Sequence, residues 1–147
     1  MMADVIFDVD GTLMDIEHRR RFVEKSPKNF KAFRKDMIYD TPNKDVVMMA
    51  KLLKEAGNRI IIATGRLEDD SSLTRRQLSD AGVSWDAMFF RAKSDEFKPD
   101  SEIKEKFLAR MKANGFNPTM AFDDRQKVVD MWRRNGLRVF QVDKGDF

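Results

Sequence analysis

The sequence has no cysteine, one histidine and no long apolar run. The absence of cysteine excludes disulfide bonds, thiolate metal ligands and a cysteine nucleophile. The single histidine, His18, excludes a metal centre built from several imidazoles. We expect it to lie exposed at a helix start, without a catalytic role. No stretch approaches the roughly 18 apolar residues of a membrane span, and Met1–Phe7 lacks the basic and apolar segments of a signal peptide. We therefore expect no membrane partner and a cytoplasmic location.

The chain also lacks the sequence Gly-x-x-x-x-Gly-Lys-Ser/Thr. Because that loop cradles the phosphates of nucleoside triphosphates in P-loop enzymes, we expect no P-loop kinase activity. Of the 147 residues, 41% are hydrophobic and 36% are charged, with a net charge of +3. This length and balance are typical of one folded domain with one core. No repeat or linker divides residues 1–147, so we expect a single domain.

The stretch with the most chemical information is Asp4–Thr12. Its apolar run, Val5–Phe7, is typical of a fully buried strand. The run ends in two carboxylates, Asp8 and Asp10, at the place where open α/β sheets put their active sites. Burying two like charges there is costly unless a cation or a basic residue offsets them. The stretch therefore predicts a divalent-metal site that handles phosphate, although an aspartate-rich turn after a strand is also compatible with it.

Further apolar runs alternate with helical patterns along the chain. Strands are expected at 59–63, 87–90, 119–122 and 137–142, and helices at 68–81, 100–114 and 125–135. Another helix should begin at Asp40-Thr41-Pro42, a capping residue followed by proline, with apolar residues at helical spacing from Val46 to Leu53. Strands that alternate with helices form a parallel sheet covered on both faces. We therefore expect a three-layer α/β/α fold with five parallel strands.

Residues 15–40 interrupt this alternation and are expected to form a small helical insert over the site. Two short helices are expected at about 16–25 and 28–37. Eight basic residues lie in this part of the chain: Arg19, Arg20, Arg21, Lys25, Lys28, Lys31, Arg34 and Lys35. Clustered positive charge favours a phosphate backbone as partner, but a solvated helix face has the same composition.

Polar side chains follow three of the predicted strands. Asp8 and Asp10 follow the first, Thr64-Gly65-Arg66 the second and Asp123-Asp124 the fourth. Carboxylates without histidine or cysteine suit a hard cation such as Mg²⁺. Hydroxyl and cationic groups beside a metal suit a transferring phosphoryl group, and Gly65 lets a ligand approach the backbone closely.

Two further residues join this inventory from the helix predicted at 100–114. Asp100 and Lys104 stand four positions apart, so they can pair, and Asp100 can orient the lysine. An aspartate such as Asp8 can serve as the nucleophile. A second aspartate two residues later, Asp10, can protonate the leaving group and then activate water.

These positions resemble the four motifs of the haloacid dehalogenase (HAD) superfamily of phosphotransferases. The matching residues are Asp8-Val9-Asp10-Gly11-Thr12, then Thr64, then Lys104, then Asp123-Asp124. The resemblance covers nearly the whole chain. It implies a HAD-like Rossmannoid fold with a small helical cap insert after the first strand.

Other segments resemble the 3′-phosphatase domain of bacteriophage polynucleotide kinase/phosphatases. They are Ala121–Arg125, Val128–Arg134 and Gln141–Phe147, with Ile60–Arg66 and the Asp100/Lys104 pair at compatible spacing. The resemblance implies a Mg²⁺-dependent phosphatase acting on the 3′ ends of DNA or RNA in a bacteriophage-like source, with the cytoplasm of the host as its location.

The resemblance also implies how the acidic residues act. Asp8 would attack the phosphorus and form an aspartyl-phosphate. Asp10 would be the general acid and base, and its backbone carbonyl would bind the metal. Asp124 would bind Mg²⁺ through its carboxylate, with Asp123 beside it or behind it. In the same way, Thr64 and Lys104 would hold the phosphate, Lys104 would also neutralise Asp8, and Arg66 and Arg19 would contact the substrate.

Two other functions remain open at this level. The first is a phosphatase with the same chemistry acting on nucleoside monophosphates or other small phosphate esters. The second is a non-catalytic phospho-acceptor domain, because such domains also place an acidic pocket, a threonine and a lysine on a parallel sheet. The presence of Asp10 two residues after the nucleophile favours turnover over a long-lived acyl phosphate.

Overall fold

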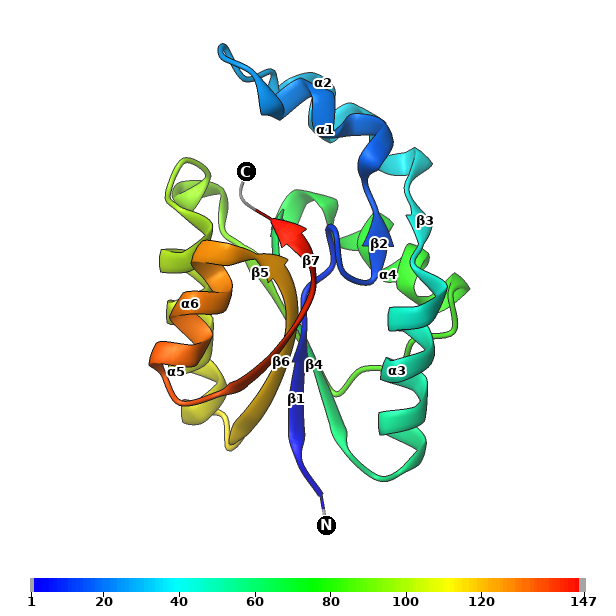
Figure 1. Cartoon of the computed structure of the whole chain (residues 1–147), viewed down its shortest axis with the longest axis vertical. Coiled ribbons are helices and arrows are strands. Elements are labelled where there is room, and N and C mark those ends of the chain that lie inside the picture. Colours follow the sequence, from blue (N-terminus) through cyan, green and yellow to red (C-terminus); the bar gives the residue numbers. More distant parts are fainter. Residues whose placement is uncertain (1, 146–147) are drawn as a thin grey trace.

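A five-stranded parallel sheet lies between two layers of helices in the computed structural model, which describes residues 2–145 (Figure 1). The strands are β1 (Asp4–Phe7), β4 (Arg59–Leu67), β5 (Ala87–Arg91), β6 (Pro118–Arg125) and β7 (Arg138–Gly145). They are hydrogen-bonded in the order β5-β4-β1-β6-β7, with every pairing parallel. The predicted three-layer α/β fold is confirmed, and β1 lies at the centre of the sheet.

Helices α3 (Lys44–Glu55) and α4 (Ser71–Asp80) lie on one side of the sheet in Figure 1, and α5 (Asp100–Ala113) and α6 (Gln126–Arg134) lie on the other. Side chains alternate between the faces along a strand. Val5 and Phe7 therefore pack in the core cluster that includes Val46 and Val47 of α3. Ile6 packs in the opposite cluster with residues of α5 and α6, including the fully buried Trp132. Both faces of β1 are thus sealed from water.

Three strands run further than the sequence pattern predicts. β4 continues through Thr64-Gly65-Arg66, and β6 continues through Asp123-Asp124. The pairing shifts register between Ala63 and Leu67 in β4, and β6 shows a similar irregularity before Arg125. β7 extends to Gly145 beside the end of β6. The polar residues interrupt the regular ladder without ending the strands. An irregularity of this kind re-aims side chains at a sheet edge.

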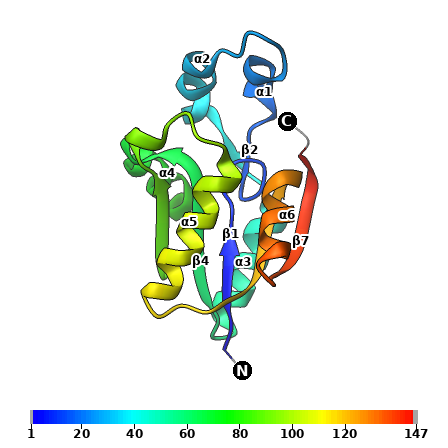
Figure 2. The same cartoon turned by 90° about the vertical axis from the view of Figure 1, so that its left-hand side faces the viewer.

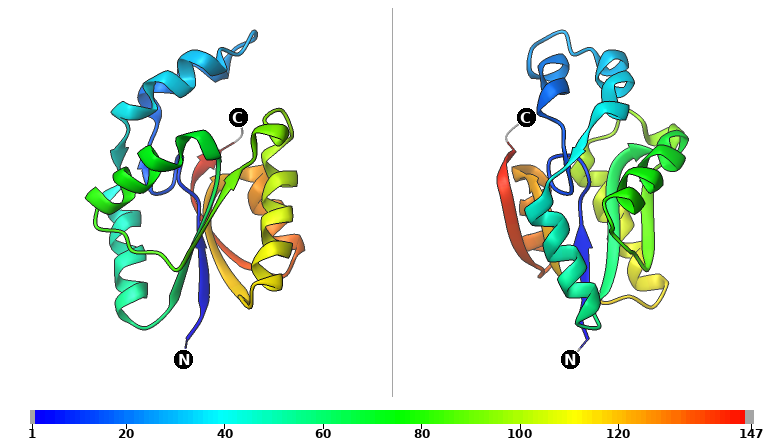
Figure 3. Two further views of the ribbon diagram at one scale, coloured as in Figure 1. Left: turned by 180° about the vertical axis from the view of Figure 1, so that it is seen from behind. Right: turned by 90° about the vertical axis from the view of Figure 1, so that its right-hand side faces the viewer.

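The insert begins and ends on a short antiparallel pair, β2 (Met14–Asp15) with β3 (Thr41–Pro42). Between them lie α1 (Glu17–Glu24), α2 (Phe30–Lys35) and the 3₁₀ turn η1 (Asp36–Tyr39). The insert projects beyond the carboxyl ends of the strands, as Figures 2 and 3 show from both sides. The two predicted helices are confirmed in place, although each is shorter than expected.

The predicted start of α3 at Asp40-Thr41-Pro42 is wrong. The helix begins at Lys44, after Asn43, and Thr41-Pro42 forms β3. A proline is tolerated in a short edge strand because its missing N–H can face away from the ladder. The proline that suggested a first helical turn therefore belongs to the strand that closes the insert.

Two further 3₁₀ turns, η2 (Glu68–Asp70) and η3 (Lys93–Asp95), follow β4 and β5. Across residues 2–145, no helix combines the length and the apolar character that a membrane crossing requires. Asp146 and Phe147, the last two residues of the similar segment Gln141–Phe147, lie outside the described residues.

Candidate active site

The sheet brings the acidic residues of β1 and β6 to one edge. Asp8 directly follows β1, and its N–H donates to the carbonyl of Phe122 in the neighbouring strand at 3.0 Å. Asp123 and Asp124 lie one and two residues beyond Phe122, so the strand pairing places them beside Asp8. All three carboxylates are at least 95% buried. The expectation that the strand ends meet at one edge is therefore confirmed for these residues.

Lys104 is the cation at the centre of this cluster. Its Nζ lies 2.8 Å from Asp8 Oδ1, 3.0 Å from Asp123 Oδ2 and 3.6 Å from Asp100 Oδ2. Burial alone would lower the pKa of Lys104, but the surrounding carboxylates, first those of Asp123 and Asp8, raise it well above its usual value. Lys104 is therefore a permanent positive charge against the carboxylate that is expected to react.

The acidic cluster has the donors that a divalent cation needs. Oxygens of Asp8, Asp123 and Asp124 all lie within 4.8 Å of one another. Among residues 2–145, none provides a hydrogen-bond partner for the buried Oδ1 of Asp124. Burial and the charge of Asp123 raise the pKa of Asp124 to about 6, and the same two causes raise that of Asp8 well above its usual value. Three crowded carboxylates around one lysine fit a bound cation, which would lower both pKa values.

Glycine is required at position 11 beside this cluster. Gly11 has a φ of +81° and a Cβ there would overlap the Asp124 carboxylate. The turn after β1 can therefore approach Asp124 only without a side chain. The opposite wall is closed by Thr12, whose hydroxyl donates to Asp8 Oδ2 at 3.1 Å.

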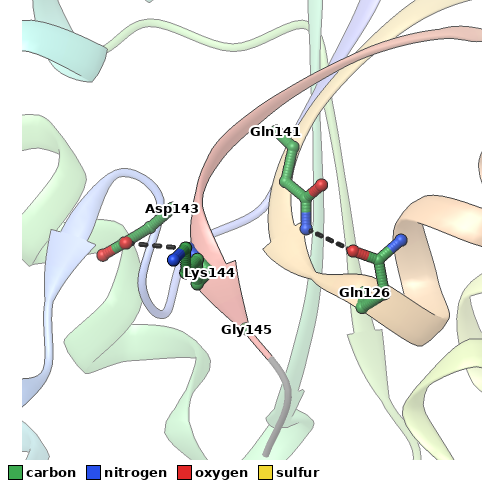
Figure 4. Close-up of a pocket in the computed structure, with 5 residues that line it drawn as sticks. All are labelled: Gln126, Gln141, Asp143, Lys144 and Gly145. Atoms are coloured by element: carbon green, nitrogen blue, oxygen red, sulfur yellow. Dashed lines mark hydrogen bonds between the residues drawn. The ribbon is translucent and has the colours of Figure 1, made fainter.

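Residues of α6 and β7 also hold Asp123 and Asp124 in place. The indole N–H of Trp132 donates to Asp123 Oδ2 at 3.1 Å. The side-chain amide of Gln141 donates to the backbone carbonyl of Asp124 at 3.1 Å. It also donates to Gln126 Oε1 at 3.1 Å, as Figure 4 shows. Trp132 and Gln141 belong to two of the segments that carry the family resemblance, and their contacts show that these segments help to fix the acidic residues.

The hollow drawn in Figure 4 has a volume of about 560 Å³ and lies between β7 and the start of α6. It is lined by Gln126, Gln141, Asp143, Lys144 and Gly145. A Cβ on Gly145 would overlap the backbone of Asp124, so the two strands approach closely here.

Asp10 is positioned by two buried arginines. Its Oδ1 accepts from the guanidinium of Arg19 at 2.9 Å and from Arg66 Nε at 2.9 Å. Burial would raise the pKa of Asp10, but the charges of Arg66 and Arg19 lower it below its usual value. The sequence predicted that both arginines contact substrate; in this structure both side chains are fully buried and pair with aspartates.

Asp40 completes this arrangement, and the sequence analysis did not include it in the site. Its side chain is fully buried and accepts from Arg19 Nε at 2.8 Å and from Arg66 at 2.9 Å. His18, exposed at the start of α1, also lies 2.8 Å from Asp40 Oδ1. Asp10, Asp40, Arg19 and Arg66 therefore form a buried cluster of two negative and two positive charges. The only sequence signal for Asp40 was its position as an aspartate at the end of the basic insert, and the Asp40-Thr41-Pro42 pattern led us to interpret it as a helix cap.

Thr64, Gly65 and Asp100 occupy the neighbouring part of the sheet edge. The Thr64 hydroxyl accepts from the backbone N–H of Arg66 at 3.1 Å. A Cβ on Gly65 would overlap the Asp100 carboxylate, so glycine permits this close approach. Asp100 receives a hydrogen bond from Arg91 at 2.9 Å and faces Lys104. The predicted Asp100–Lys104 pair is present, at a longer distance than the contacts of Lys104 with Asp8 and Asp123.

A cleft of about 990 Å³ leads from the insert to this edge. Asp8, Asp10, Gly65, Arg66 and Asp100 line its inner end. Basic side chains outnumber acidic ones in its lining, eight to five. The candidate nucleophile therefore lies at the end of a cleft with an excess of positive charge.

The chain matches a known family along nearly its whole length. The family model of the polynucleotide kinase PNKP phosphatase domain matches residues 2–147. A chain in a solved structure of the Pnkp1/Rnl/Hen1 complex is 31% identical, with a TM-score of 0.80 over 99% of this chain. A chain of the Pnkp1/Rnl/Hen1 RNA repair complex has the same identity and TM-score.

This chain spans 47% and 43% of the lengths of those two proteins. The L-2-haloacid dehalogenase from Xanthobacter autotrophicus has the same fold, with a TM-score of 0.63 at 16% identity, over 97% of this chain and 78% of that one. The chain belongs to the family of polynucleotide kinase PNKP phosphatase domains and is a phosphatase of the haloacid dehalogenase type.

Proposed function

We propose that this chain is a Mg²⁺-dependent phosphomonoesterase that removes the 3′-phosphate from polynucleotide ends through an aspartyl-phosphate on Asp8. It would act as one domain over residues 1–147, with residues 15–40 as the cap. The observation that carries the chemistry is the contrast between two neighbouring aspartates. Asp8 lies against Lys104 and the acidic cluster, whereas Asp10 lies between Arg19 and Arg66.

In the first step, Asp8 attacks the phosphorus and the bond to the 3′ oxygen breaks. The aspartate gains a phosphoryl group, and the departing alkoxide takes a proton from Asp10. Lys104 and the Thr64 hydroxyl would face the developing charge on the phosphoryl oxygens, because such charge is stabilised by fixed donors in a dry site. The buried ammonium of Lys104 also offsets the negative charge that Asp8 brings to a phosphate dianion.

Asp10 must hold a proton before this step and accept one after it. With both arginines in place its pKa is low, which suits the second step, in which the carboxylate takes a proton from the water that hydrolyses the aspartyl-phosphate. Arg66 also lines the cleft. A phosphate dianion beside Asp8 would compete with Asp10 for this guanidinium, and a weaker pairing raises the pKa of Asp10 toward the protonated form.

Mg²⁺ would be held by Asp8 and Asp124, with Asp123 beside them and the backbone carbonyl of Asp10 as a further oxygen donor. When bound, it supplies positive charge to the phosphoryl oxygens. The all-oxygen donor set fits a hard cation. Burial and the charge of Asp123 raise the pKa of Asp124 to about 6 even though Arg20 lies 3.3 Å from its Oδ2, so a further cation would stabilise the charged form. Asp123 is fixed by Lys104 and Trp132, so its role would be to position the other two.

The polynucleotide substrate is supported by the charge of the cleft and by the relatives. A phosphate backbone attracts the basic side chains of α2, and this attraction depends on salt. The solved relatives belong to complexes described as Pnkp1/Rnl/Hen1, one of them an RNA repair complex. RNA ends are therefore included in the proposed substrate class together with DNA ends.

The test is phosphate release from four substrates, with Mg²⁺ and with EDTA. They are an oligonucleotide with a 3′-phosphate, the same one with a 5′-phosphate, and the free 3′- and 5′-mononucleotides. Asp8→Asn is the blank, since an amide cannot form the acyl phosphate. A preference for the 3′-phosphorylated oligonucleotide that disappears in EDTA supports the proposal. If mononucleotides react as fast or faster, the chain is a small-molecule phosphatase and the polynucleotide assignment fails.

A further inference from the structure

Two phenylalanines with strongly exposed side chains lie in the lining of the cleft. Phe97, between η3 and α5, is 89% exposed, and Phe30, the first residue of α2, is 57% exposed. Exposed aromatic rings cost free energy in water because each leaves a large apolar area hydrated. Their presence in the cleft that leads to Asp8 indicates a ligand with flat apolar faces.

The segment that carries Phe97 is anchored from inside the protein. The buried Arg91 donates from one guanidinium nitrogen to the backbone carbonyls of Asp95 at 3.0 Å and Lys98 at 2.6 Å. Its other nitrogens donate to Gly65 and Asp100, next to the candidate phosphate site. One arginine therefore fixes the position of Phe97 relative to the sheet edge at which the reaction would take place.

The opposite wall of the cleft combines an aromatic ring with positive charge. Lys28 lies with its Nζ 5.9 Å from the centre of the Phe30 ring. Lys31 and Lys35 extend the basic surface along α2, and all three lysines are exposed. The insert leans over the carboxyl end of the sheet in Figure 1, and the three lysines line the same cleft as Asp8. Aromatic faces beside a charged track are the elements that bind single-stranded nucleic acid without sequence preference.

We propose that Phe97 and Phe30 stack the unpaired bases at the 3′ end and that this stacking makes the enzyme prefer single-stranded over fully paired ends. This proposal rests on the polynucleotide function proposed above and specifies which form of the 3′ end, single-stranded or paired, the cleft prefers. In a blunt duplex only the outer face of the terminal base pair is free and the inner bases stack on each other, whereas an unpaired 3′ end can offer the faces of successive bases to two phenylalanine rings. The lysines of α2 would follow the backbone upstream of the terminal phosphate.

The experiment measures kcat/KM for one 3′-phosphorylated strand, alone and annealed to a complement that leaves a blunt end. The wild-type chain should process the free strand faster. Phe97→Ala and Phe30→Ala should each lower kcat/KM for the free strand by roughly 5-fold to 150-fold, the range found when one base-stacking side chain is removed. Phe97→Trp should restore it, because tryptophan offers an equal or larger stacking face.

Three controls keep the test decisive. Tyr39→Ala removes an aromatic ring that is 70% exposed but does not line the cleft, and it should retain the wild-type preference. Lys31→Gln should lower the slope of log kcat/KM against log salt by about one unit for each strand form, which separates charge from stacking. All rates are compared with hydrolysis of a 3′-mononucleotide by the same variant, so a general loss of folded enzyme cancels.

The outcomes are distinct. If the wild-type chain prefers mononucleotides, the proposed function itself fails. If the oligonucleotide is preferred but the ratio of free-strand to mononucleotide rates stays within twofold of wild type in the Phe30→Ala/Phe97→Ala double variant, only the stacking proposal is overturned. Equal rates on the free strand and the blunt duplex would overturn it as well.

Discussion

Replacing Asp40 with asparagine tests whether the insert fixes the geometry of Asp10. The substitution keeps the shape of the side chain but leaves the buried cluster of Arg19, Arg66 and Asp10 with one positive charge uncompensated. Removing one partner of a buried ion pair costs about 3–5 kcal/mol. For a chain of this size each kcal/mol lowers Tm by about 2–4 °C, so Tm should fall by at least about 6 °C.

The assay combines thermal unfolding with phosphate release at a temperature at which both proteins are folded. We expect kcat to fall more than KM rises, because Asp40 acts by positioning Asp10 through the arginines and does not line the cleft. The effects of Asp40→Asn and Asp10→Asn on kcat should not be additive, since both changes act on one catalytic group.

Asp70→Asn is the matched control. Its pair with Arg34, at 2.7 Å, also links the insert to the main sheet, but the arginine side chain is 39% exposed. Such a partly exposed pair contributes about 1 kcal/mol or less. Equal losses of Tm in the two variants would refute the reasoning, and so would an Asp40→Asn protein with the kcat of the wild type.

Four further predictions concern the acidic residues and a hydrogen-bond partner of Asp123. Asp10→Asn should let the aspartyl-phosphate on Asp8 accumulate, detected as acid-stable labelled protein; unchanged steady-state phosphate release would exclude the acid/base role. Mg²⁺ should raise Tm more at pH 7.5 than at pH 5, because the Asp124 carboxyl, with a pKa of about 6, must lose its proton to bind the metal. In the metal-free folded protein the pKa of Asp124 lies above the ordinary 3.8, so between pH 3.8 and about 6 the folded protein binds more protons than the unfolded chain. The Asp124 contribution to stability should therefore fall as pH rises through about 4 to 6. In Asp124→Asn, both this pH dependence and that of the Mg²⁺ effect should disappear. Trp132→Phe should lower the free energy of unfolding by about 1.5–3 kcal/mol, the cost of losing a hydrogen bond to the buried charged Asp123, and an unchanged urea midpoint would contradict this.

The acidic edge could be predicted from the sequence because its determinants are local. A buried strand alternates its side chains, and Asp8 follows directly on Val5–Phe7, so its place at the carboxyl end required no long-range information. The same held for Asp123, because it follows the apolar end of β6. The strand ends were placed too early because pairing resumes beyond the polar residues, at Leu67 with Arg91.

Residues that act through distant partners could not be predicted in this way. Asp40 meets Arg19 and Arg66, which are 21 and 26 positions away, and only the folded insert brings them together. The apolar pattern of α3 does not by itself show which of its residues are buried. Met49 and Leu52 follow the apolar pattern of that helix, yet they are 38% and 51% exposed, because the sheet covers only part of its apolar face.

The position of the four-charge cluster has a consequence for how such enzymes can vary. Arg66 comes from the sheet, whereas Arg19 and Asp40 come from opposite ends of the insert, immediately beyond its two-stranded base. The segment between α1 and α2 can therefore change in length and sequence to suit another substrate. The base of the insert cannot change in this way, since any exchanged cap must place a cation and an anion where Arg19 and Asp40 now lie. Under the proposed mechanism, the cap of this fold is thus free to vary at its tip, whereas its root positions the acid/base Asp10.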